Sequence, residues 1–209
     1  MAIVAILVSP LAAPQLLAFP HVVQSNGDTV YSVALVDRRA LDRVTARANA
    51  LVAKSPLART AEPRSIFLTD GGWRWSLLAL GNSTTLALTR PLREAVIVRR
   101  SDLRADQVPT AFGTRTLSGI IAHEKCHGME RRHFGLTVDW TKPQWLREGY
   151  CDVVGAESTL SDEQARRLIA SGQKAPALIY WQGRKRVETT LAANGGDVDA
   201  LFASARSRR

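Results

Sequence analysis

Two histidines and a glutamate in the stretch "IIAHEKCHGM" (120–129) have the types and spacing of a zinc site. Residues four apart lie one turn from each other on a helix, so His123 and His127 would present their imidazoles on one face. Neutral imidazole is a good zinc ligand, and Glu124 could act as a general base toward a water molecule. So short a pattern also occurs by chance, and catalytic zinc sites use three protein ligands. The hypothesis therefore depends on a third ligand elsewhere in the chain.

One candidate for the third ligand is His133, ten residues after His123. This spacing resembles the metzincin pattern, in which a glycine at the eighth position turns the chain so that the last histidine reaches the metal. Here the eighth position is Glu130, a good helix former. If the helix continues, His133 lies about 80° from His123 and about 120° from His127 around the axis. The sequence therefore disfavours His133 as a ligand.

The other candidate is Glu148, twenty-one residues after His127 in "KPQWLREGYCDVVG" (142–155). Pro143 suits the first turn of a helix, and Asp152 falls four residues after Glu148 on the same helix face. An acidic helix face is often only solvated, but the neighbouring apolar residues favour a buried role. We expect Glu148 to bind the metal and Asp152 to accept the outer N–H of a ligand histidine, His123 in the first place.

The combined pattern resembles the gluzincin metallopeptidases of the peptidase MA-like group. In that group an HExxH helix, here His123, Glu124 and His127, is followed by a helix with a glutamate ligand and an acidic residue four positions on, here Glu148 and Asp152. "WLREGYCDVV" also resembles the W-x-x-E-G stretch of many bacterial members. The resemblance covers residues 116–157 and implies a zinc-dependent peptidase that acts on peptide or protein substrates.

The same resemblance implies a zincin-like fold, in which the active helix packs beneath a small twisted sheet whose edge strand pairs with extended substrate. We expect "AVIV" (95–98) to be that edge. Relatives stabilise the oxyanion with a later tyrosine or histidine. This chain offers Tyr180 first, and then Tyr150 or His133, and the motif does not decide among them.

The order of the predicted elements indicates the fold class. A strand over 28–36 follows the Asn26-Gly27 turn, and a helix over 37–55 has Asp37 as a plausible N-cap. Because strands come first and helices second, we expect an α+β fold: a small mixed or antiparallel sheet, then a mainly helical C-terminal half. The remaining elements are strands over 64–70, 84–88 and 94–100, and helices over 116–133, 143–157, 161–171, 178–193 and 197–204.

Composition and charge indicate where the domain lies and what it contacts. The chain has 209 residues and a net charge of +9, scattered without a basic stripe, so we expect no nucleic-acid partner. Residues 1–19 are apolar and uncharged and fit a signal peptide or membrane anchor, which leaves 20–209 as a single domain. We expect the protein to be membrane-anchored, through residues 1–19, or secreted or periplasmic.

The two cysteines, Cys126 and Cys151, flank ligands on the two predicted metal helices. A disulfide between them would be possible in an oxidising compartment, but we expect both to be small buried hydrophobic residues.

A second functional class remains open from the sequence: a catalytically silent module, stabilised by zinc, that binds another protein. A purely structural zinc site closes its fourth position with a protein ligand and needs no general base. The substitution Glu124→Gln separates the two classes, because only an enzyme would lose turnover.

Overall fold

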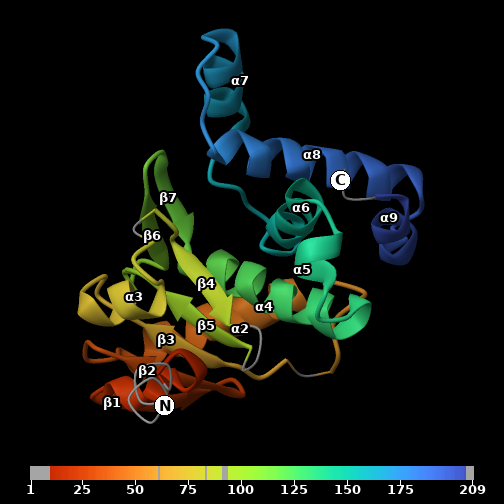
Figure 1. Cartoon of the computed structure of the whole chain (residues 1–209). Helices are drawn as coiled ribbons and strands as arrows, with labels where there is room; N and C mark the ends of the chain where they lie inside the picture. Colours follow the sequence, from red (N-terminus) through yellow and green to blue (C-terminus); the bar gives the residue numbers. More distant parts are fainter. Residues whose placement is uncertain (1–9, 61, 83, 91–93, 206–209) are drawn as a thin grey trace, which may run out of the picture.

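The computed structural model describes residues 10–60, 62–82, 84–90 and 94–205, and it confirms the α+β class (Figure 1). A mixed five-stranded sheet with strand order β1-β2-β3-β5-β4 occupies the N-terminal half, and helices make up the C-terminal half. Strand β1 is His21–Ser25, β2 is Asp28–Ser32, β3 is Ser65–Leu68, β4 is Ala87–Arg90 and β5 is Ala95–Val98.

The first two strands form an antiparallel hairpin whose turn is Asn26-Gly27, as the sequence predicts. Both turn residues have positive φ, 47° and 87°, which asparagine and glycine tolerate best. Strand β2 pairs with β3 and β3 with β5 in parallel, and β4 pairs with β5 antiparallel. The predicted strand 28–36 therefore ends early, and the strand before the turn was missed.

The sheet order corrects the expected substrate edge. Ala95–Val98 (β5) lies between β3 and β4, so both of its edges are paired within the sheet. The two edge strands are β1 and β4, and β4, Ala87–Arg90, is the one next to β5; it is shifted from the predicted strand over 84–88. Pro91, which lies between the predicted strands over 84–88 and 94–100, is outside the described residues.

Two helices cover one face of the sheet. Helix α2 (Arg38–Val52) begins at Asp37, whose side chain accepts a hydrogen bond from Ala40 N and so confirms the predicted N-cap. Helix α4 (Leu117–Phe134) is capped by Thr116, which accepts from Gly119 N. The core between these helices and the sheet contains Val30, Leu41, Val44, Ile66, Val96, Ile120 and Ile121.

The opposite face of the sheet is covered by a short 3-10 helix, η1 (Pro14–Leu17), and helix α3 (Trp73–Leu78), neither of which the sequence predicted. Leu17 and Phe19 are buried there with Phe67 and Trp75. Residues 1–9 of the expected signal or anchor lie outside the described residues. Within the described part of the chain, no helix combines the length and apolar character needed to cross a membrane.

Helix α4 forms the centre of the molecule, with the sheet on one side and the C-terminal helices on the other (Figure 1). Those helices are α5 (Val138–Thr141), α6 (Gln144–Val154), α7 (Asp162–Ala170), α8 (Ala177–Ala193) and α9 (Val198–Ser204). Helices α6 and α8 cross closely, and glycine at position 149 allows this because a Cβ there would collide with the backbone of Gly183. A further hairpin, β6 (Gln107–Thr110) with β7 (Gly113–Thr116), leads into α4.

Candidate metal centre

Helix α4 is buried around most of its circumference, so its polar residues need partners inside the protein. Every residue from Leu117 to Arg131 is buried. On the sheet side, Lys125 is fully buried and its ammonium donates to both carboxylate oxygens of Asp28 at 2.7 Å. This ion pair joins α4 to the start of β2 and fixes the rotation that presents His123 and His127 on the opposite side.

The structure brings Glu148 of α6 to the two histidines of α4. Its Oε2 lies 3.2 Å from Nε2 of His123 and 3.6 Å from Nε2 of His127. One ligand atom from each of the three residues lies within 4.8 Å of the others. Tetrahedral zinc with bonds of about 2.0–2.1 Å places its ligands about 3.3 Å apart, so the two distances from Glu148 to the histidines fit one zinc ion.

Each histidine also contacts a buried carboxylate through its other ring nitrogen. Nδ1 of His123 lies 2.9 Å from Oδ1 of Asp152, in an ion-pair contact rather than a well-aligned hydrogen bond. Asp152 is fully buried and accepts hydrogen bonds from Arg115 at 3.1 Å and from Ser158 at 2.7 Å. The contact expected between Asp152 and His123 is therefore present, and Arg115 and Ser158 fix the carboxylate.

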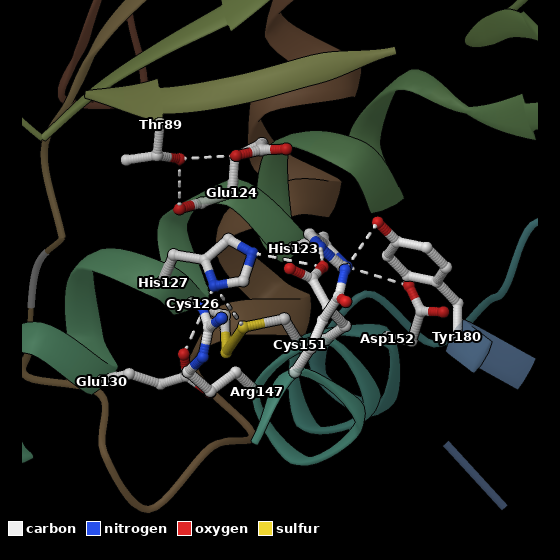
Figure 2. A network of polar contacts seen from close by, with 12 residues as sticks. Thr89, His123, Glu124, Cys126, His127, Glu130, Arg147, Cys151, Asp152 and Tyr180 are labelled. Atoms are coloured by element: carbon white, nitrogen blue, oxygen red, sulfur yellow. Dashed lines mark hydrogen bonds and ion pairs between the residues drawn. A yellow bond between two sulfur atoms is a disulfide. The ribbon is translucent and has the colours of Figure 1, made fainter. Parts of the chain in front are cut away.

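Glu130 gives His127 a similar partner that the sequence analysis missed. It is fully buried, and its Oε2 lies 3.3 Å from Nδ1 of His127, one turn away on α4 (Figure 2). Its other oxygen has no hydrogen-bond partner among the described residues. The sequence does contain a signal for this contact, because a glutamate three residues after a candidate ligand lies one turn away on the same helix.

The charges of this cluster depend on one another. Burial opposes the charged form of His123, but contacts with Asp152 and Glu148 outweigh it and raise the pKa of His123 to about 9. The pKa of His127 is also raised well above its ordinary value, because Glu148 and Glu130 outweigh the effect of burial. Burial would raise the pKa of Glu148, yet the two imidazoles hold it well below its usual value. A metal ion that binds here must displace the imidazole protons.

Glu124 faces the edge strand rather than α6. Its Oε2 accepts a 2.6 Å hydrogen bond from Oγ1 of Thr89 on β4, and the same hydroxyl lies 2.8 Å from the backbone oxygen of Glu124 (Figure 2). Glu124 and the three candidate ligands line one cleft of about 630 Å³, together with residues 84–86 and the first three residues of β4, 87–89. No local pattern in the sequence points to Thr89.

Tyr180 of α8 lines the same cleft, unlike the two alternatives considered for its role. Burial and the nearby charge of Glu148 raise the pKa of Tyr180 to about 12, so its phenol keeps its proton at neutral pH. Gln144 donates to the phenol oxygen at 3.5 Å. Tyr150 is instead a core residue hydrogen-bonded to Ser55, and His133 is half-exposed and paired with Asp199 at 2.6 Å.

The cysteines correct a further expectation. Cys126 and Cys151 are fully buried, as expected, but they form a disulfide rather than two separate thiols (Figure 2). The bond joins α4 and α6 beside the ligands, and Cys151 Sγ lies 3.5 Å from Nδ1 of His127. The two helices that carry the candidate ligands are thus covalently linked.

Comparison with protein-family models, with curated proteins and with solved structures found no match for this chain.

Proposed function

We propose that the protein is a zinc-dependent hydrolase, and specifically a peptidase. The observation that carries the proposal is that His123, His127 and Glu148 converge from two helices while Glu124 lines the same cleft. His123, His127 and Glu148 would hold the ion. Zinc in such a site supplies Lewis acidity, which activates water and polarises the carbonyl to be attacked.

The side chains have distinct roles in this proposal. Glu124 accepts the proton of the attacking water at its carboxylate and transfers it to the leaving amine. Thr89 holds that carboxylate through its 2.6 Å hydrogen bond. Tyr180, whose phenol stays protonated, donates to the oxygen on which negative charge develops. Asp152 and Glu130 hold the outer nitrogens of the two imidazoles, which leaves both Nε2 atoms for the metal.

The edge strand β4 suits a peptide substrate. It pairs within the sheet only with β5, and residues 84–89 line the cleft that contains Glu124. An extended peptide could add to this edge through backbone hydrogen bonds, with its scissile bond near His123 and Glu124. This arrangement favours peptide bonds over small amides.

The disulfide supports a location outside the reducing cytosol. Disulfides persist mainly in secreted and periplasmic proteins and at cell surfaces. The Cys126–Cys151 bond therefore favours a secreted, periplasmic or membrane-anchored protein.

Metal analysis and turnover of matched variants test the function. The wild-type protein and Glu124→Gln should each retain about one zinc ion per chain, whereas Glu148→Ala should lose it. Hydrolysis of an unfolded protein substrate should fall by about 10²–10⁴-fold in Glu124→Gln. The control is Glu163→Gln on α7, an exposed carboxylate outside the cleft. Retention of zinc by Glu148→Ala would refute the ligand set. If zinc-loaded wild type hydrolysed no substrate, the enzyme would be refuted and the catalytically silent, zinc-stabilised module would be the function that remains.

A further inference from the structure

A second cavity, of about 340 Å³, lies against α4 and shares one described lining residue, Arg131, with the proposed active-site cleft. Its size is within the range of about 300–1,000 Å³ that small-molecule sites occupy. We call it the arginine cavity. Its charged lining residues among those that the structure describes are Arg59, Arg64, Arg131, Arg132, Glu62 and Glu94.

The arginine cavity has an excess of positive charge. Four guanidinium groups face two carboxylates, which leaves two positive charges uncompensated. Arg131 also pairs with Asp139 at 3.2 Å. Asp139 pairs at the same distance with Arg147, so the negative charge of Asp139 and the positive charge of Arg147 cancel and the excess in the cavity is unchanged. Within the described part of the chain, the Arg59 side chain is exposed and has no ion pair. Such an excess in a concave site favours a dianion.

Arg64 provides an independent indication of a ligand. Its side chain is only 10 % exposed, and it pairs through one terminal nitrogen with Glu62 at 3.1 Å. Its Nε is buried without a hydrogen-bond partner among the described residues. A buried guanidinium donor without an acceptor is costly, so a small rotation of the side chain that presents this N–H to an acceptor bound in the cavity would stabilise Arg64.

We propose that the arginine cavity binds a phosphate group, either as the free ion or as a monoester. A phosphate monoester carries about −1.5 to −2 charges at neutral pH, which matches the excess of the lining. Guanidinium groups bind phosphate oxygens with two parallel hydrogen bonds, and several can surround one tetrahedral group. A carboxylate carries half of that charge and offers two oxygens in one plane.

The site adjoins the proposed metal centre. Gly128, which follows His127, lines the arginine cavity, and Arg131 lines both this cavity and the cleft. A side chain at position 128 would collide with Glu94 and Arg64, so glycine allows both groups to approach the helix. Phosphate binding does not require the proposed zinc chemistry, and the two proposals can fail separately.

Calorimetric titration of the full chain with inorganic phosphate, phenyl phosphate and acetate tests the proposal, in chloride buffer at constant ionic strength. Both phosphates should bind saturably and acetate at least about tenfold more weakly, because one charge-assisted hydrogen bond is worth about a factor of ten. Tighter binding of phenyl phosphate would identify a monoester, and equal or weaker binding would identify the free ion. Acetate that binds as tightly as phosphate would overturn the proposal.

Three charge-matched variants locate the site. Arg64→Gln and Arg59→Gln should each weaken phosphate binding by about tenfold. Arg38→Gln, which removes the same charge from an exposed position on α2, should change it less than twofold. Arg59→Gln breaks no ion pair in the structure and keeps the test valid if Arg64→Gln does not fold. Equal phosphate affinities in all three variants would overturn the proposal. Loss of phosphate binding in a fourth variant, Glu148→Gln, would also overturn it, because phosphate would then bind at the proposed zinc site.

Discussion

Thr89 of the edge strand donates a 2.6 Å hydrogen bond to the carboxylate of Glu124, across 35 positions of sequence. This contact joins the strand proposed to hold substrate to the residue proposed to move its protons. It orients the carboxylate before any substrate arrives, and such pre-orientation lowers the cost of reaching the reactive geometry.

We expect Thr89→Val to lower kcat by about tenfold or more while leaving the zinc content unchanged, because a hydrogen bond to a charged group is worth about 1.5–3 kcal/mol. The measurement is steady-state hydrolysis together with metal analysis. Thr85→Val is the control, since its hydroxyl lines the same cleft without a hydrogen bond to Glu124. An equal loss of kcat in both variants would contradict the orienting role of Thr89.

We expect Glu130→Gln and Asp152→Asn each to weaken zinc binding by about 10–100-fold, because each removes the charge that holds one imidazole. Competition with a chromogenic chelator measures the affinity. Glu163→Gln on α7 removes an exposed carboxylate and should leave it unchanged. If Glu130→Gln bound zinc as tightly as wild type, its contact with His127 would be structural only.

The two helices that carry the candidate ligands could be predicted from the sequence because their signals are local. His123 and His127 share a helix face through their spacing, as do Glu148 and Asp152, and Pro143 correctly indicates where the second helix begins. That the two helices meet is implied by the resemblance to gluzincins and not by spacing. Glu130 could also have been found, since a carboxylate three residues after a histidine lies one turn away. Thr89 could not, because its contact depends on the register between β4, β5 and α4.

The wrong edge strand has a physical reason that the sequence contained. "AVIV" (95–98) is apolar at every position and all four residues are buried, which is typical of a strand covered on both faces. "ALTR" (87–90) ends in polar residues and is only half-buried beyond Ala87, which suits an edge.

The hairpin β6–β7 was missed because its strands have four residues each and one of them contains Pro109, so the sequence there shows little strand periodicity.

The disulfide leads to a prediction for stability. Cys126 and Cys151 are 25 residues apart, and in the chain-entropy account a loop of that length stabilises the folded state by about 3–4 kcal/mol. We expect the double variant Cys126→Ser/Cys151→Ser to lose about that much free energy of unfolding in urea and to bind zinc more weakly, because α4 and α6 are no longer joined. Wild type treated with a reductant should behave in the same way. Unchanged zinc affinity in both would show that packing alone positions the ligands.

Glu62 gives a pH dependence that is separate from the metal site. Burial would raise its pKa, but hydrogen bonds from Arg132 and from the backbone of Arg59, with the charges of Arg132 and Arg64, lower it below 4.5. A carboxylate with a lowered pKa in the folded state stabilises the protein above its unfolded pKa, and this contribution is lost as the pH falls through the folded pKa.

We therefore expect Glu62→Gln to reduce the free energy of unfolding by about 2 kcal/mol at pH 7, and the difference from wild type to shrink as the pH falls below 4.5. Urea unfolding in phosphate-free chloride buffer at pH 7, 5, 4 and 3 measures it. Other carboxylates titrate in both proteins and cancel in the difference, and Glu163→Gln should show a small difference at every pH. A difference for Glu62→Gln that stays constant from pH 7 to pH 3 would mean that the Glu62 carboxylate does not stabilise the fold through its charge.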